Sequence, residues 1–152
     1  MLHTRSIGAS FQSTMTRHSN LRITAKFMIP YILLFALYVQ FHGDFGPGGG
    51  FQAGVIFASG FILYGLIFGI ENARRVLPAR VTRVLLAIGV LLFGGTGIVS
   101  VFFGHNFLDY SVLLKNSVSG QHLGIFLVEL GVGITVSATM ITIFYIFASQ
   151  DK

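Results

Sequence analysis

Four long apolar segments constrain the fold of this chain more than any other feature of its sequence. They cover residues 22–41, 51–70, 84–103 and 123–147. Each is close to the length of about 20 residues that a helix needs to cross the hydrocarbon core of a bilayer. Only one charged side chain, Glu129, lies in the last three segments. The sequence therefore predicts an all-α, polytopic membrane protein with four transmembrane helices in a single membrane domain.

The composition agrees with a membrane location and excludes several other classes of protein. Of the 152 residues, 53% are hydrophobic and only 10% are charged, and the mean hydropathy is +0.78. Soluble domains carry about 25% charged residues. The absence of cysteine excludes disulfides and thiolate metal sites. The formal net charge is +5, but no basic stretch is interleaved with aromatic side chains, so we expect membrane lipid as a partner and no nucleic acid.

The basic residues predict the orientation in the membrane. Nine of the ten Lys and Arg residues lie before or at the start of the first segment, between the second and third segments, or at the C-terminus. Only Lys115 lies in the 104–122 connection. Because basic residues concentrate on the cytoplasmic side of membrane proteins, we expect both termini in the cytoplasm. Residues 1–21 are then a cytoplasmic tail, and the loop between the first two segments and the 104–122 connection lie outside.

The stretch between the first two segments is rich in glycine and contains one proline. No helix or strand is expected to pass through it, because proline lacks an N–H donor and glycine is costly to order. Irregular backbone is tolerated at a membrane only in water or where protein or a polar cavity covers it. The stretch is therefore either a tight solvent turn or a built polar feature. The residues expected to form this structural loop are Pro47, Gly48, Gly49 and Gly50.

Small residues predict which helix faces pack together, because a small residue every four positions lets two helix backbones approach closely. The second segment carries such a stripe at Gly54, Ala58, Gly65 and Gly69. The fourth segment carries a comparable stripe at Gly124, Gly131, Thr135, Ala138 and Thr142, on the face opposite Glu129. We favour packing within the chain over contact with another chain. Protein would then cover both faces of the fourth segment, which predicts that the chain belongs to a larger assembly.

Glu129 is the only acidic residue within the four segments. At 1.5 Å per residue it lies roughly 10–14 Å from the outer end of its helix. A charged group near the bilayer centre costs roughly 2.5–3.5 kcal/mol on insertion scales. Two interpretations stay open: a neutral, hydrogen-bonded Glu that holds helices together, and a waypoint for a proton or cation.

Weaker candidates for ion binding are His42, Asp44, His122 and Asp109. His42 and Asp44 are two residues apart in the glycine-rich stretch, where solvation and turn capping are expected more often than cation binding. Asp109 is expected to cap a short interfacial helix. His122 shares the helix face of Glu129, but with no further His or Cys near the outer connection we predict no metal site.

Motifs for catalysis are missing from the sequence. The glycine-rich stretch matches neither a phosphate-binding loop nor a dinucleotide fingerprint. The segments offer no combination of nucleophile, base and orienting group. We therefore expect neither an enzyme nor a cofactor.

The run Gly-Asp-Phe-Gly-Pro-Gly-Gly-Gly-Phe-Gln-Ala-Gly from Gly43 to Gly54 follows directly on Gln40-Phe41-His42. It resembles the signature of the B-type subunits of multisubunit Mrp-type (Mnh-type) Na⁺/H⁺ antiporters, in which Pro-Gly-Gly-Gly-Phe-Gln is followed by any residue and Gly. The larger A-type subunits of that family end in a related domain, but their size excludes them here. Many relatives have His after the first Gly of the loop, where this chain has Asp44.

The resemblance implies a non-catalytic membrane subunit of a hetero-oligomeric antiporter that exchanges Na⁺ for H⁺ without a cofactor. It implies partner subunits of types A, C, D, E, F and G in a bacterial or archaeal cell membrane. In that family the ionisable chains for proton translocation lie mainly in the large A-type and D-type subunits, so the present chain would support assembly and line part of the cation route. Two alternatives stay open, a self-contained four-helix proton-coupled carrier and a purely structural scaffold subunit. Copurification with other membrane subunits would separate the antiporter interpretation from these two.

Overall fold

The computed structural model describes residues 3–43, 48–114 and 116–150, with the backbone alone described for residues 3–18, 112 and 150. Its elements are α1 (His3–His42), α2 (Gly50–Phe68), α3 (Ile70–Val76), α4 (Ala79–Phe102), the 3₁₀ helix η1 (Tyr110–Val112) and α5 (Ser117–Gln150). All regular structure in these ranges is helical.

Four of these helices are long and apolar enough to cross a membrane. The spanning stretches are Ser19–His42 in α1, Gly50–Phe68 in α2, Ala79–Phe102 in α4 and Ser117–Ser149 in α5. The glycine-rich stretch lies between the first two of them. The structure thus confirms the predicted all-α fold with four transmembrane helices.

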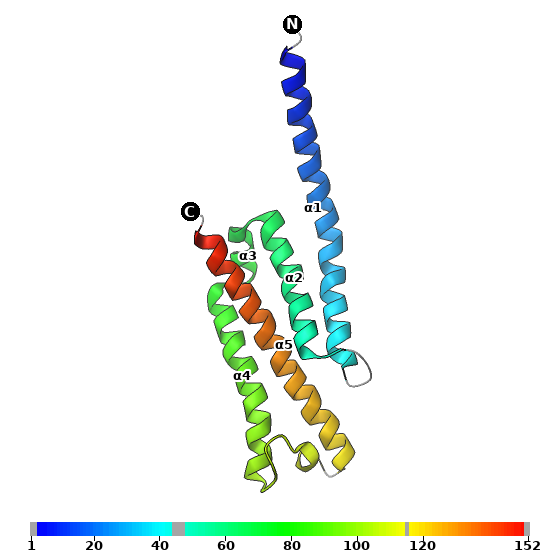
Figure 1. The fold of residues 1–152 in the computed structure, drawn as a ribbon, viewed down its shortest axis with the longest axis vertical. Coiled ribbons are helices and arrows are strands. Elements are labelled where there is room, and N and C mark those ends of the chain that lie inside the picture. Colours follow the sequence, from blue (N-terminus) through cyan, green and yellow to red (C-terminus); the bar gives the residue numbers. More distant parts are fainter. Residues whose placement is uncertain (1–2, 44–47, 115, 151–152) are drawn as a thin grey trace.

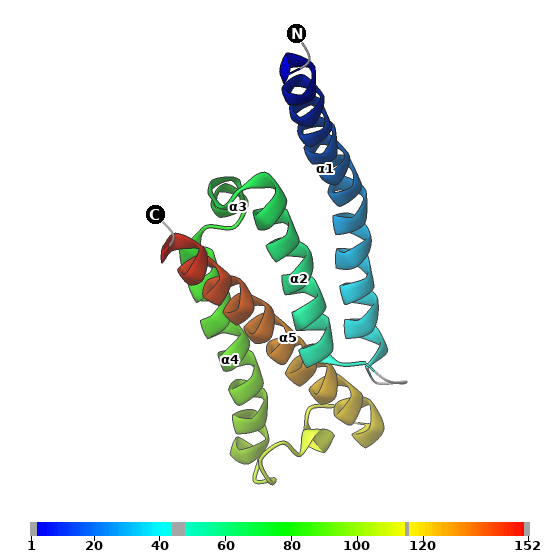
Figure 2. The same cartoon turned by 45° about the horizontal axis from the view of Figure 1, so that its top comes forward.

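The long helices are arranged as a row in the order α1, α2, α5, α4 (Figures 1 and 2). Each packs mainly on its neighbours in the row, and α1 makes only minor contact with α5. Along the length of these helices, both chain ends and α3 lie at the same end, here called the tail end (Figure 1). Gly43, Gly48 and the 103–114 connection lie at the opposite end, here called the loop end. Every helix in the row keeps at least one face that no other helix of the chain covers.

Helix boundaries differ from the apolar segments that predict them. Helix α1 already begins at His3, α4 at Ala79 and α5 at Ser117, because a helix can continue through polar residues that hydropathy does not mark. Helix α2 instead ends early, at Phe68, since Gly69 has a φ of 94° that L side chains rarely adopt. An added Cβ at Gly69 would meet nothing within 4 Å. Gly69 is therefore a helix-ending turn residue and departs from the predicted packing stripe.

At the tail end, a cluster of buried side chains joins α2, α3 and α5. Its members are Ala58, Ala73, Ile141 and Tyr145. The Tyr145 hydroxyl donates a hydrogen bond to the Leu77 carbonyl (2.8 Å). Arg74 donates to the Tyr145 carbonyl (3.2 Å) and to the Ser149 hydroxyl (2.7 Å). These bonds fix α3 against the end of α5.

Helix α5 packs on α4 through residues without bulk. An added Cβ at Gly131 would lie 2.9 Å from both the Gly89 carbonyl oxygen and the Phe93 nitrogen, and one at Gly89 would lie 2.8 Å from the Gly131 carbonyl oxygen. The Thr135 hydroxyl in the same seam donates to the Gly131 carbonyl (2.8 Å), so this hydroxyl is hydrogen-bonded where the two backbones meet. A larger residue at either glycine would push the two helices apart.

Helix α5 packs on α2 through a second set of small residues. An added Cβ at Gly54 would lie 2.7 Å from the Gly133 carbonyl oxygen, and one at Gly65 would lie 2.7 Å from the Phe144 ring. Helix α5 therefore has other segments of the chain on two sides, α4 on one and α2 on the other.

Candidate functional site

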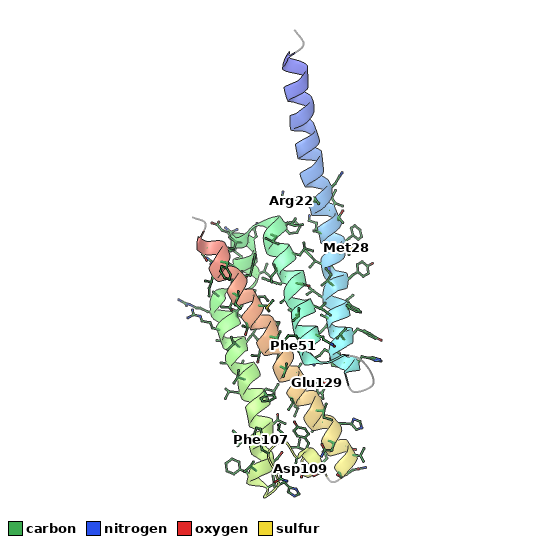
Figure 3. All side chains as sticks on the ribbon, in the orientation of Figure 1. Arg22, Met28, Phe51, Phe107, Asp109 and Glu129 are labelled. Atoms are coloured by element: carbon green, nitrogen blue, oxygen red, sulfur yellow. The ribbon has the colours of Figure 1, made fainter. Side chains whose placement is uncertain are left out.

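The carboxyl group of Glu129 lies against the glycine-rich stretch. An added Cβ at Gly43 would lie 2.5 Å from Oε2 and 2.9 Å from Oε1 of Glu129, and one at Gly49 would lie 3.4 Å from Oε1. At Gly50 an added Cβ would collide with the main-chain carbonyl of Glu129. Figure 3 shows Glu129 on α5 beside Phe51 at the start of α2. A Cβ at Gly50 would collide with the backbone of Glu129 and one at Gly43 would displace its carboxyl group, whereas Gly49 is required by its positive φ.

The beginning of α2 favours a negative charge at this place. Helix α2 starts at Gly50, and Gly49 is its N-cap residue, with a φ of 124°. The N-terminus of a helix carries a partial positive charge that stabilises nearby anions. Glu129 therefore lies where an ionised carboxylate has local electrostatic support.

The described part of the loop is folded back onto the end of α1. The Gly49 N–H donates a long hydrogen bond to the Val39 carbonyl (3.4 Å), and an added Cβ at Gly48 would lie 2.9 Å from the same oxygen. Gly49 and Gly50 are buried. Of the two interpretations from the sequence, this geometry favours a built polar feature over a solvent turn. Pro47 lies outside the described residues.

Gln40 is a polar residue of the site that the sequence reasoning missed. Its side chain is only 6% exposed, and an added Cβ at Gly133 would lie 2.5 Å from its Oε1. Its Nε2 is buried and has no hydrogen-bond partner among the described residues. A buried amide without a partner is costly. The sequence signal was an uncharged polar side chain in the last turn of an apolar segment, three residues before Gly43.

Two cavities, each partly open to the surface of the chain, meet at Gln40. The larger, here called the loop-end cavity, measures about 480 Å³ and is lined by Gln40, Phe41, Leu114, Ser119, His122, Leu123, Phe126 and Glu129. The smaller, here called the inner cavity, measures about 220 Å³ and is lined by Ala36, Leu37, Gln40, Ala53, Gly54, Phe57, Leu85, Leu130, Gly133, Ile134 and Ser137. The rings of Phe41 and Phe126 stack with centroids 5.8 Å apart and flank the loop-end cavity. The acid and the buried amide therefore share one cavity.

The structure brings one of the weaker candidates to Glu129 and keeps others apart. His122 lines the loop-end cavity with Glu129. His42 stacks its ring on Tyr38, with centroids 5.1 Å apart, and is not among the lining residues. Asp44 lies outside the described residues. Within the ranges that the structure describes, no group of three or more His, Cys, Asp or Glu residues could hold a metal ion.

Asp109 organises the 103–114 connection. It is the N-cap residue of η1, where its Oδ1 accepts hydrogen bonds from the amide (3.2 Å) and the hydroxyl of Ser111. Its Oδ2 lies 3.1 Å from Nδ1 of His105, and Gln121 Nε2 of α5 donates to Oδ1 (3.4 Å). The hydrogen bonds from Ser111, with a smaller effect of His105, lower the pKa of Asp109. Asp109 thus caps the short helix that the sequence placed there, and it does not line the loop-end cavity.

Tyr110 anchors the connection to α5. Its ring lies against Gly124, where any added Cβ would collide with it. Its burial raises the pKa of its phenol. The small residue at 124 therefore makes room for η1, whereas Gly131 further along the same stripe makes room for α4.

Comparison with known proteins decides the family. The domain described as related to the MnhB subunit of Na⁺/H⁺ antiporter matches residues 20–142. The chain belongs to the MnhB family. Its relatives include proteins of Staphylococcus aureus strains Newman and JH1, each named "Putative antiporter subunit mnhB2" and 39% identical to this chain over 126 residues. The alignment covers 81% of this chain and 89% of each relative. The MnhB match contains the glycine-rich stretch, Gln40 and Glu129, and it confirms the resemblance found in the sequence.

Proposed function

We propose that this chain is a membrane subunit of a multisubunit Na⁺/H⁺ antiporter, with Na⁺ and H⁺ as transported ions and no cofactor. The observation that carries the proposal is the MnhB match over residues 20–142, since that range contains the acid, the buried amide and the glycine-rich stretch that together form the site. The antiporter-subunit relatives support the same conclusion.

The chain works as a component and does not transport ions alone. Glu129 is the only acid in its spanning segments, and a single acid cannot form a relay across a bilayer. The outer helices of the row also leave large apolar side chains uncovered by the chain itself, including Phe27, Tyr31, Leu34 and Phe35 on α1 and Val90, Leu91 and Ile98 on α4. Lipid and partner subunits of types A, C, D, E, F and G cover these faces.

Glu129 serves the complex as a waypoint for a proton or cation. An acid that only joined helices would need no open space, whereas this carboxyl group borders a cavity of about 480 Å³. The N-terminus of α2 supports its ionised form, and the cavity gives it access to water. It can therefore change its charge during transport.

The loop end faces the outside of a bacterial or archaeal cell, and both termini face the cytoplasm. The support is the distribution of basic residues, nine of which fall at the tail end by sequence position and one, Lys115, in the connection at the loop end.

Copurification tests the proposal. A tagged chain, isolated in mild detergent from a host that carries the whole antiporter, is expected to bring down the other membrane subunits in fixed proportions. Vesicles from a host that lacks only this chain are expected to lose Na⁺-dependent proton exchange, and the intact chain supplied in trans should restore it. Purified chain that exchanges Na⁺ for protons by itself would support the small carrier instead. Normal exchange without the chain would contradict any role in transport.

A further inference from the structure

The two cavities follow one another along α5 and differ in polarity. The loop-end cavity runs from Ser119 to Glu129, a helix length of about 15 Å, and its polar lining residues are Gln40, Ser119, His122 and Glu129. The inner cavity is lined by apolar residues and glycine apart from Gln40 and Ser137. The hydroxyl of Ser137 is already bonded to the Ile134 carbonyl (3.1 Å). Gln40 is the one residue that both cavities share.

Polarity decides which of these cavities holds water. A buried water needs two to four polar partners, and each water takes about 30 Å³ of space. The loop-end cavity has room for several waters and offers polar groups along its length. The inner cavity offers water few polar partners, because only Gln40 and the already bonded Ser137 are polar there. A water at the boundary would accept a hydrogen bond from Nε2 of Gln40, the buried donor that has no partner among the described residues.

We propose that the loop-end cavity is a water-filled blind passage that ends at Gln40 and delivers protons to Glu129 from the loop end only. The ligand is water and the proton that it carries. A bare metal cation does not match an N–H donor at the end of the passage. Gln40 is a positioning residue, because it acts on Glu129 by holding the terminal water. The inference rests on the proposed function for the statement that the arriving proton takes part in antiport.

The ionisable surroundings of Glu129 are few. His122 lines the same cavity from α5, and His42 precedes Gly43 at the end of α1. Helix α2 carries no charged side chain from Gly50 to Phe68. The arginines of α4, Arg80 and Arg83, lie in its first turns, at the tail end. Among the described residues, His122 is thus the group whose charge bears most directly on the passage.

Carboxyl modification in the assembled complex tests the passage without any transport measurement. Membrane vesicles of either orientation are treated with a water-soluble, cationic carbodiimide and glycine amide, and modified peptides are counted by mass spectrometry. The chain supplies its own controls, because Asp109 lies at the loop end and Glu71 lies on α3 at the tail end. Vesicles that expose the loop end should show modified Glu129 and Asp109. Vesicles that expose the tail end should show modified Glu71 but no modified Glu129 or Asp109.

The variant Gln40→Met tests the end of the passage, since Met keeps the length of the side chain but removes the donor. Carbodiimide reacts with the protonated acid. Without Gln40 the terminal water, which donates to the ionised carboxylate, is lost, and this should raise Glu129 modification near neutral pH about fivefold, the effect of one hydrogen bond. Modification of Asp109 and Glu71 should not change. Gln40→Asn, which keeps an amide, should stay closer to the natural chain.

Three results would overturn the inference: modification of Glu129 from both ends, no modification from the loop end while Asp109 reacts, or an unchanged Glu129 response in Gln40→Met. If Gln40→Met does not assemble, the sidedness of modification in the natural complex still decides. A chain that labels as expected but copurifies with no partner would leave the passage intact and contradict the antiporter function.

Discussion

At the scale of single residues, three glycines explain how a carboxyl group can lie at a helix junction within a membrane protein. Gly43, Gly49 and Gly50 come from one stretch of chain and Glu129 from another 79 to 86 positions away in the sequence. A Cβ at Gly43 or Gly50 would lie less than 3.0 Å from Glu129, and Gly49 has a φ of 124° that L side chains rarely adopt. The glycines bring backbone dipoles to the acid, and the cavity brings water. This combination makes ionisation of Glu129 testable by substitution.

The first prediction concerns Glu129→Gln. Gln keeps the shape and the hydrogen bonds of the neutral acid but cannot ionise. We expect a normal yield of complex together with lower Na⁺-dependent proton exchange or a shifted pH profile, measured in vesicles matched for complex content. Glu129→Asp should retain part of the exchange. An unchanged pH profile in the Gln variant would show that the acid is only a helix contact.

The second prediction concerns Gly43→Ala. The added methyl group would lie 2.5 Å from Oε2 of Glu129, so the carboxyl group at the end of this flexible side chain must move away. We expect nearly normal amounts of assembled complex on native gels and lower exchange per complex. Gly94→Ala is the matched control, because a Cβ at Gly94 meets nothing within 4 Å. Equal behaviour of the two variants would contradict the close contact.

The third prediction concerns Asp109 and pH. The hydrogen bonds from Ser111 lower the pKa of Asp109 below 3.8. A carboxyl group with a lowered pKa stabilises the folded state above its unfolded pKa and loses this effect as the pH falls through the folded value. Protection of the 104–114 amides, taken as their exchange rate relative to that of an unstructured peptide at the same pH, should therefore be constant from neutral pH down to about 4 and fall only below that. Asp109→Asn keeps an Oδ1 acceptor for Ser111 but cannot ionise, so it should lose this pH dependence, and the same pH dependence in both proteins would refute the cap.

The sequence alone predicted some of these residues and could not predict others. Glu129 stood out because an acid in an apolar segment is costly, and Asp109 because caps follow local rules. Gln40 was missed because an amide is common at the end of a span, and its burial depends on Gly133 from a distant helix. The contact between Glu129 and Gly43 was missed for the same reason, since periodicity gives the face of a helix but not what lies opposite.

At the scale of elements, α5 decides the architecture. Its small residues face α4 and η1 on one side, while Gly133 and the region of Glu129 face α2 and the glycine-rich stretch on the other. Hydropathy predicted the four long helices because apolar length is a local property. It did not predict that α1 and α5 extend well past their apolar segments, nor that Gly69 ends α2. Those outcomes depend on backbone angles and solvation at the membrane surface.

The fourth prediction concerns the seam between α4 and α5. Gly131→Leu places a large side chain where an added Cβ already lies 2.9 Å from the backbone of Gly89 and Phe93. We expect the chain to insert into the membrane but to give several-fold less complex on a native gel, because the helices can no longer approach. Gly95→Leu on α4 is the control, since a Cβ at Gly95 meets nothing within 4 Å. Comparable losses in both variants would mean that the seam is not specific.

At the scale of the whole molecule, a row of four helices explains why this chain needs partners. A closed bundle can hide polar residues on its inside, whereas a row exposes both of its faces. The inner cavity is lined by residues of all four long helices. The exposed apolar side chains of α1 and α4 suit lipid or other membrane subunits. The MnhB family match also indicates that the chain has partner subunits, because the family is described by a subunit of an antiporter.

The last prediction tests the orientation of this row. The chain contains no cysteine, so single cysteines can be introduced at Ser13, Ser117 and Gln150 without a background from the chain itself. Because basic residues favour the cytoplasm, an impermeant thiol reagent applied to intact cells should label Ser117→Cys and spare Ser13→Cys and Gln150→Cys. After the cells are permeabilised, all three should react, which shows that the spared positions are accessible in principle. The opposite pattern would reverse the orientation and place the passage to Glu129 on the cytoplasmic side. Labelling of Ser13→Cys together with Ser117→Cys in intact cells would instead rule out four spans, because the three crossings between these two positions must place them on opposite sides of the membrane.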